Sequence, residues 1–118
     1  MTISESRNNG LEGSSMFHVS AARAAAGATL LDQLMPGWAG HIDTGELDIQ
    51  YDQSCVLGQL VGSYNGAPAD LKKAPISNGF FSEAQAKGID GTPVDDEYAE
   101  LTAAWKPEIE KRRTPVAA

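Results

Sequence analysis

The residues with the most reactive side chains lie in the middle of the chain. Cys55 could act as a nucleophile, with His41 as its base and Asp43 as the carboxylate that orients the histidine. A thiol near the start of a helix would also have a lowered pKa. However, Cys55 borders an apolar stripe, where a single cysteine is commonly a small buried hydrophobe, and no glycine-rich oxyanion loop accompanies it. A small cysteine-dependent enzyme is therefore kept as a second alternative function.

Candidate metal ligands occur in the same region and include both histidines, the cysteine and several acids, namely His18, His41, Cys55, Asp43, Asp48 and Asp52. None of them follows a ligand spacing such as H-x-x-x-H or C-x-x-C. The glycines form no phosphate-binding pattern before a Lys and a Ser or Thr. We predict no metal and no cofactor. We expect the acids, with Glu46, to cap helices and to solvate one side of the domain.

Aromatic side chains are the best candidates for a partner-binding surface, because they dominate the hot spots of protein interfaces. Most of them are expected in the core. The adjacent Phe80 and Phe81 lie on a short element, however, and two neighbouring aromatic side chains cannot easily both point inward. The predicted partner-binding residues are Phe80, Phe81 and Trp38.

Charge and cysteine content restrict the function classes further. The chain of 118 residues has a net charge of −7, of which −5 falls in residues 27–64. Phosphate repels such a chain, so we expect no nucleic-acid binding. A single cysteine excludes an intrachain disulfide and fits a reducing compartment. We expect a cytoplasmic protein without membrane contact, because no run is long enough to span a bilayer and the N-terminus lacks a signal-peptide pattern.

The first half of the chain predicts two main helices. One is expected over residues 20–35, with Ser20 as the N-cap and Pro36 as the stop. Asp52 would cap the other, over residues 53–63. Between them, a short helical turn from Trp38 would place two apolar side chains inward. Residues 47–51 (LDIQY) alternate apolar and polar residues, which could be a strand or a linker. A single strand has no partner here, so a linker is expected.

The second half predicts a turn-rich loop over residues 65–79, then a short helix and a long one. Ser82 and Gln85 form a capping box before the short helix, and Gly88 would end it. Thr92 would cap the long helix, and the acids in its first turn, including Glu97, favour its positive end. Its apolar face repeats every three or four residues, at Val94, Tyr98, Leu101, Trp105 and Ile109. We expect a kink or a brief break at Pro107.

These elements together predict an all-α domain, a compact bundle of four or five helices with long turn-rich connections. Residues 1–15 are rich in Ser, Asn and Gly and should form a flexible N-terminal tail, because they cannot bury enough surface to offset their ordering entropy. Residues 16–113 would form a single helical domain, and residues 114–118 a frayed C-terminus.

Three segments carry a resemblance to a known group: GATLLDQLMPGWAGHIDTGELD, CVLGQLVGSY and YAELTAAWKPEIEKRR. They resemble a family of small uncharacterised proteins from actinobacteria and their bacteriophages. The matching positions are Gly27, Leu30, Leu31, Asp32, Pro36, Gly37, Trp38, Ile42, Asp43, Leu47, Asp48, residues 55–60, Ala104 and Trp105. Some relatives have a second cysteine shortly before the position of Cys55, where this chain has Gln53 and Ser54. The resemblance implies a phage-encoded protein in an actinobacterial host and carries no activity with it.

The leading functional expectation is a small, acidic, non-catalytic interaction module that acts on a host or phage protein. The absence of a chemical motif, the small size, the acidic composition and the resemblance motivate it. The first alternative is a minor virion or assembly component, because repeated self-contact could order the N-terminal tail. The sequence predicts no oligomeric state.

Overall fold

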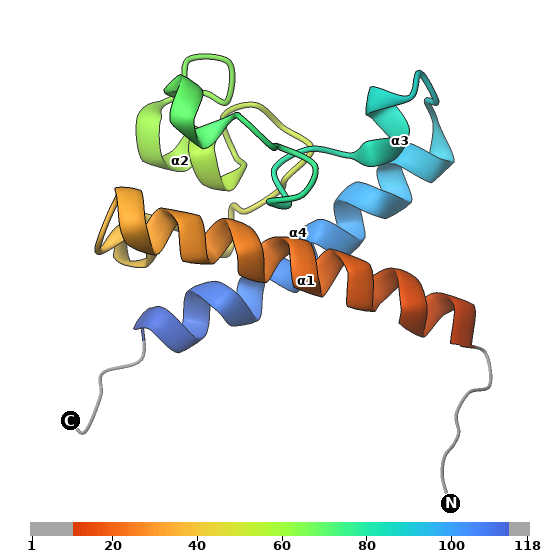
Figure 1. Ribbon diagram of the computed structural model, residues 1–118, viewed down its shortest axis with the longest axis horizontal. Coiled ribbons are helices and arrows are strands. Elements are labelled where there is room, and N and C mark those ends of the chain that lie inside the picture. The colour runs from red at the N-terminus through yellow and green to blue at the C-terminus, as the bar shows by residue number, and fades with distance from the viewer. Residues whose placement is uncertain (1–10, 114–118) are drawn as a thin grey trace, which may run out of the picture.

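The computed structural model describes the backbone of residues 11–113 and the side chains of residues 18–113. Over this range the protein is all-α, as predicted, with four α-helices, two short 3-10 helices and no strand. The expected flexible residues 1–10 and frayed residues 114–118 lie outside the described residues. Figure 1 shows α1 crossing in front of α4, with α2 above the C-terminal half of α1 and most of the rest of the connecting segment above the two helices in this view.

Helix α1 spans Leu11–Leu34 and therefore begins nine residues before the predicted start. Ser20 was expected to cap it but lies inside the helix and is buried. The helix continues on the N-terminal side of Ser20, because tertiary packing covers the face of α1 on which the serine lies. Residues 11–15, predicted to belong to the tail, are helical. The predicted end is confirmed, since Pro36 follows α1 closely.

Helix α4 spans Thr92–Arg113 and buries the predicted apolar face completely. It is one uninterrupted helix through Pro107, so of the kink or brief break expected there, the break is wrong. Residues late in α1 meet residues late in α4, as in the Asp32–Arg112 ion pair, and earlier residues meet earlier ones, as in Arg23–Glu97. The two helices therefore run in the same general direction. Joining them requires the long connection that the chain supplies in residues 35–91.

Small residues on α1 let the connection pack closely against it. A Cβ at Gly27 would collide with the carbonyl of Asn78 and the ring of Trp105. Gly79, at φ +73°, lies directly against the backbone of Arg23 and Ala24. The indole Nε1–H of Trp105 donates to the Gly79 carbonyl at 2.8 Å. This narrow face therefore receives the loop at Asn78 and Gly79 and the Trp105 side chain of α4.

The connection begins with the 3-10 helix η1, Trp38–His41, which buries Trp38 and the following Ile42 as predicted. Residues 47–51 contain no strand, in agreement with the expected linker, and both Leu47 and Ile49 are buried. The Ile49 N–H donates to the Thr102 hydroxyl of α4, which fixes this loop on the helix pair.

Helix α2 spans Val56–Val61 and is shorter than predicted. Asp52 does not cap it. Cys55 is the N-cap, with its sulfur accepting from Gly58 N–H at 3.2 Å. Asp52 instead holds the loop after α2, because its carbonyl accepts from Tyr64 N–H and its carboxylate from Asn65 N–H. The helix cannot begin at residue 53, because the Asp52–Gln53 backbone folds back against Gly58, where no Cβ would fit.

The short 3-10 helix η2 spans Ala69–Leu71 and buries Leu71 in the core. Helix α3 spans Glu83–Ala86, with Ser82 as its N-cap as predicted and Gly88 in the left-handed region at φ +86° after it. No described helix is long and apolar enough to cross a membrane.

Candidate functional site

The predicted partner-binding aromatics are mostly core residues. Trp38 and Phe80 are both buried and pack against Trp105, at ring-centroid distances of 5.8 and 5.5 Å. The Trp38 indole N–H donates to Asp32 at 2.9 Å. The surface exposure that a binding role for Phe80 or Trp38 would need is therefore not present. Both rings are buried because they pack against Trp105 in the hydrophobic core.

Phe81 is the predicted aromatic that remains half-buried at the surface. It stacks on Tyr64 at 6.0 Å and meets Tyr98 edge to face at 6.3 Å. These rings and Cys55 line a pocket of about 180 Å³. The rings contact one another, so Phe81 is held by the fold and does not project freely toward a partner.

The proposed catalytic set is not assembled around Cys55. Its sulfur contacts the Gly58 N–H and the Asp52 carbonyl, whereas Asp43 is bound through its backbone to Gln59. His41 lies on η1, in the wall of a different pocket from the one that Cys55 lines. Burial raises the pKa of the Cys55 thiol, the opposite of what activates a nucleophilic cysteine.

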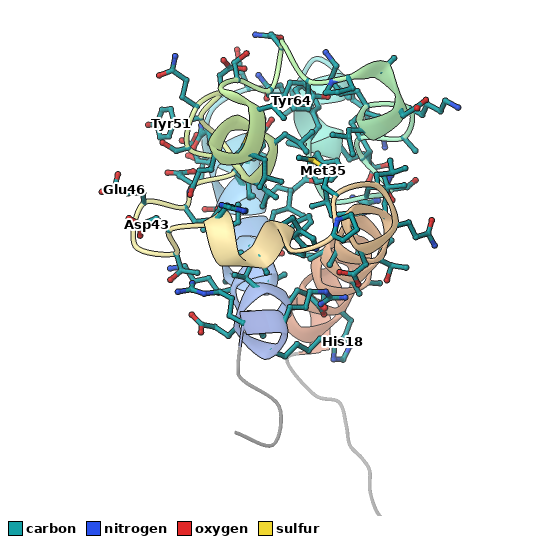
Figure 2. The ribbon with its side chains drawn as sticks, turned by 90° about the vertical axis from the view of Figure 1, so that its left-hand side faces the viewer. His18, Met35, Asp43, Glu46, Tyr51 and Tyr64 are labelled. Carbon is teal, nitrogen blue, oxygen red and sulfur yellow. The ribbon has the colours of Figure 1, made fainter. Side chains whose placement is uncertain are left out.

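The candidate metal ligands are also dispersed. No group of three or more His, Cys, Asp or Glu side chains within the described range is arranged to hold a metal ion. Asp43 and Glu46 point outward on the same side of the molecule as Tyr51, and His18 lies elsewhere on α1 (Figure 2). Asp43 accepts from the N–H groups of Gly45 and Glu46 and so caps a turn instead of a helix.

The strongest candidate site is a cleft of about 310 Å³ that the sequence did not indicate. It lies between the middle of α1, helix α3 with the residue after its stop, and the first half of α4. We call it the α1–α3–α4 cleft. Its lining residues combine apolar side chains with five charged ones, and they are Val19, Ser20, Arg23, Glu83, Ala84, Lys87, Ile89, Glu97 and Glu100.

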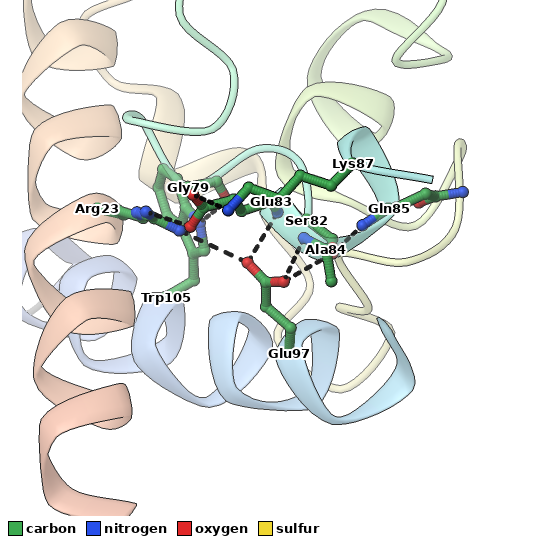
Figure 3. Close-up of polar contacts among 9 residues, drawn as sticks. All are labelled: Arg23, Gly79, Ser82, Glu83, Ala84, Gln85, Lys87, Glu97 and Trp105. Carbon is green, nitrogen blue, oxygen red and sulfur yellow. Dashed lines mark hydrogen bonds and ion pairs between the residues drawn. The ribbon is translucent and has the colours of Figure 1, made fainter. Parts of the chain in front are cut away.

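Glu97 forms the polar floor that joins α4 to α3 (Figure 3). Its carboxylate accepts from the Ser82 hydroxyl at 2.8 Å and from the N–H groups of Glu83 and Ala84 at 2.8 and 2.9 Å. Glu97 therefore satisfies the N–H groups at the start of α3 that have no partner within that helix. The sequence assigned Glu97 to the positive end of its own helix, but the end that it stabilises belongs to α3. The Gln85 side chain, which a full capping box would place on the Ser82 N–H, instead accepts from the Tyr98 hydroxyl.

Arg23 connects the same network to α1. Its guanidinium donates to Glu83 at 3.0 Å and lies 3.5 Å from Glu97. The hydrogen bond from Arg23 lowers the pKa of Glu83, with a further contribution from Lys87 at 3.3 Å. These groups therefore satisfy one another and hold α3 against both long helices.

Two kinds of group in the cleft are left unsatisfied. Val19 and Ile89 are large apolar side chains with 47% and 44% of their surface exposed. Glu100, one turn after Glu97, has a carboxylate oxygen that is buried without a hydrogen-bond partner in the described part of the chain. Native structures rarely leave such an acceptor unpaired. The cleft can therefore offer a ligand apolar contact and the carboxylate of Glu100.

Comparisons of the chain with protein-family models, curated proteins and solved structures give no match.

Proposed function

We propose that this chain is a protein-interaction module that binds a segment of another protein in the α1–α3–α4 cleft. The observation that carries the proposal is the exposure of Val19 and Ile89 in the lining of one cleft. Burying apolar surface drives most protein association, and the two side chains already stand on elements held by the Glu97 network. Binding would thus require little reordering of the site.

The size and charge of the site also favour a protein segment. A cleft of about 310 Å³ is at the lower limit for a drug-sized ligand, so it suits one or two side chains of a larger partner. The net charge of −7 opposes binding to a phosphate-rich polymer. In this proposal the module acts in the cytoplasm of an actinobacterial host on a host or phage protein, as the resemblance implies.

The test is affinity capture from actinobacterial lysate with matched serine variants, followed by mass spectrometry. Val19→Ser and Ile89→Ser should abolish capture of the partner, because each removes apolar contact in the cleft. Leu34→Ser is the control, because Leu34 is 45% exposed and lies outside this cleft. It should capture the same protein in the same amount as the unmodified chain.

Circular dichroism of each variant would show that the fold is retained, since all three positions are on the surface. Equal capture by the cleft variants and the unmodified chain would contradict the proposed site. Capture of no stoichiometric protein by the unmodified chain would contradict the proposed function itself.

A further inference from the structure

The charges that line the α1–α3–α4 cleft do not cancel. Three glutamates, one arginine and one lysine line it, which leaves a formal charge of −1. Glu83 is paired with Arg23 and Lys87, and Glu97 with Arg23 and the start of α3. The surplus negative charge is therefore on Glu100. Its buried Oε1 has no partner among the residues described.

A ligand with a cationic group beside Glu100 would offset the negative charge that is left unbalanced there. Hydrogen bonds between charged partners are stronger than neutral ones, so a cationic donor gains most. The neighbouring surface is apolar, through Val19, Ala84 and Ile89. A ligand that fits both features carries a cationic head on an aliphatic stem.

We propose that the cleft receives a lysine or arginine side chain of the partner protein, with its stem against Val19 and Ile89 and its cationic head on the Glu100 carboxylate. This inference rests on the proposed function and specifies the group that is recognised. Glu100 lines the cleft, so the incoming cation would meet its carboxylate there. The overall negative charge of the chain would speed the approach of a basic segment.

The side-chain chemistry can be tested without the partner, by following backbone amide NMR signals during titration with n-butylammonium and n-butylguanidinium. Both cations should produce saturating shifts at Val19, Ala84 and Ile89. Uncharged 1-pentanol, which has a similar stem, should bind at least about tenfold more weakly. Glu100→Gln should weaken binding of the cations by a similar factor.

Glu46→Gln is the control, because it removes an equal charge from an exposed position outside the cleft. It should leave the dissociation constants unchanged within about twofold. Cation binding that Glu100→Gln leaves intact, cation shifts that avoid the cleft, or equal binding of 1-pentanol would each overturn the inference.

Failure of the inference can be told apart from failure of the proposed function. If the cations bind at Glu100 but no variant of the chain captures a protein, the proposed function fails and the cation site stands. If Val19→Ser abolishes capture of a partner while Glu100→Gln captures it normally and binds no less cation, the function stands and the cation site is wrong.

Discussion

The centre of the α1–α4 pair and the α1–α3–α4 cleft at its side differ in how completely their side chains are buried and hydrogen-bonded. At the centre, Trp105 is fully buried and its indole N–H is bonded to Gly79, while Trp38 packs on it with its own N–H bonded to Asp32. In the α1–α3–α4 cleft, two large apolar side chains stay exposed, and one oxygen of Glu100 has no partner among the described residues. The first region is explained by folding alone, whereas we propose that a ligand completes the second.

Two glutamates on α4 show the same contrast at the scale of one helical turn. Glu97 accepts three hydrogen bonds and fixes α3, so its charge is used by the fold. Glu100 lines the same cleft, yet its buried oxygen has no partner in the described range. The two residues are of the same type on the same helix, so the difference lies in what the rest of the chain places opposite each carboxylate.

The largest expected effect comes from the closed region. Trp105→Ala should lower the free energy of unfolding by about 3–5 kcal/mol, because it empties the centre of the core and leaves the Gly79 carbonyl without its donor. A typical domain has only about 5–15 kcal/mol in total. Urea unfolding followed by circular dichroism measures the loss. Tyr51→Ala is the control, because Tyr51 is 60% exposed, and a comparable loss there would contradict the assignment.

The second largest effect on the free energy of unfolding is expected from Gly27→Ala. It should destabilise the fold, although helix propensity alone favours alanine. Alanine normally stabilises a helix interior by about 1 kcal/mol relative to glycine. Here the new methyl group would collide with Asn78 and Trp105, so we expect a net loss of about 1–3 kcal/mol in the free energy of unfolding. Gly40→Ala, where no atom lies near the added Cβ, is the control. Stabilisation by Gly27→Ala would show that the loop does not pack on α1 as described.

Acid should weaken both regions, with a smaller effect per group. Hydrogen bonds from Arg112 lower the pKa of Asp32, and those from Arg23 lower the pKa of Glu83. Each carboxyl thus binds its proton more readily in the unfolded state. Their contribution is present above the unfolded pKa values of about 4 and is lost as pH falls through the lower folded values.

Urea midpoints measured between pH 6 and pH 3 would show this decline. Asp32→Asn should flatten it, whereas Glu46→Gln, which removes an exposed carboxylate, should flatten it less. Identical pH profiles for Asp32→Asn and the unmodified chain would mean that the Asp32–Arg112 pair contributes no acid sensitivity.

Sequence reasoning predicted those parts of the fold that depend on local signals. The α4 apolar face, the Ser82 cap and the stop before Pro36 follow from spacing, side-chain type and backbone geometry, and the structure confirms them. The start of α1 and the cap of α2 were wrong, because tertiary packing decided between several possible caps. Asp52 is a good capping residue by type, but the chain uses it to hold the loop at Asn65.

The candidate site could not be predicted in the same way. Its residues come from three elements, and Arg23 and Glu97 are separated by most of the chain. A single arginine inside the alanine-rich part of α1 was the one signal available, since such a charge needs a partner when a helix packs at that face. Adjacent aromatics were a misleading signal, because Phe80 fills the core and Phe81 is held by Tyr64.

The most direct measurement compares the free energies of unfolding of Glu97→Gln and Glu100→Gln by urea denaturation. Glu97→Gln should lose about 1.5–3 kcal/mol, because an amide cannot accept all the donors that the carboxylate serves. Glu100→Gln should stay within about 0.5 kcal/mol of the unmodified chain, because no residue in the described range bonds the buried oxygen of Glu100. A loss from Glu100→Gln as large as that from Glu97→Gln would contradict the distinction, since both carboxylates would then belong to the fold and neither would be free for a ligand.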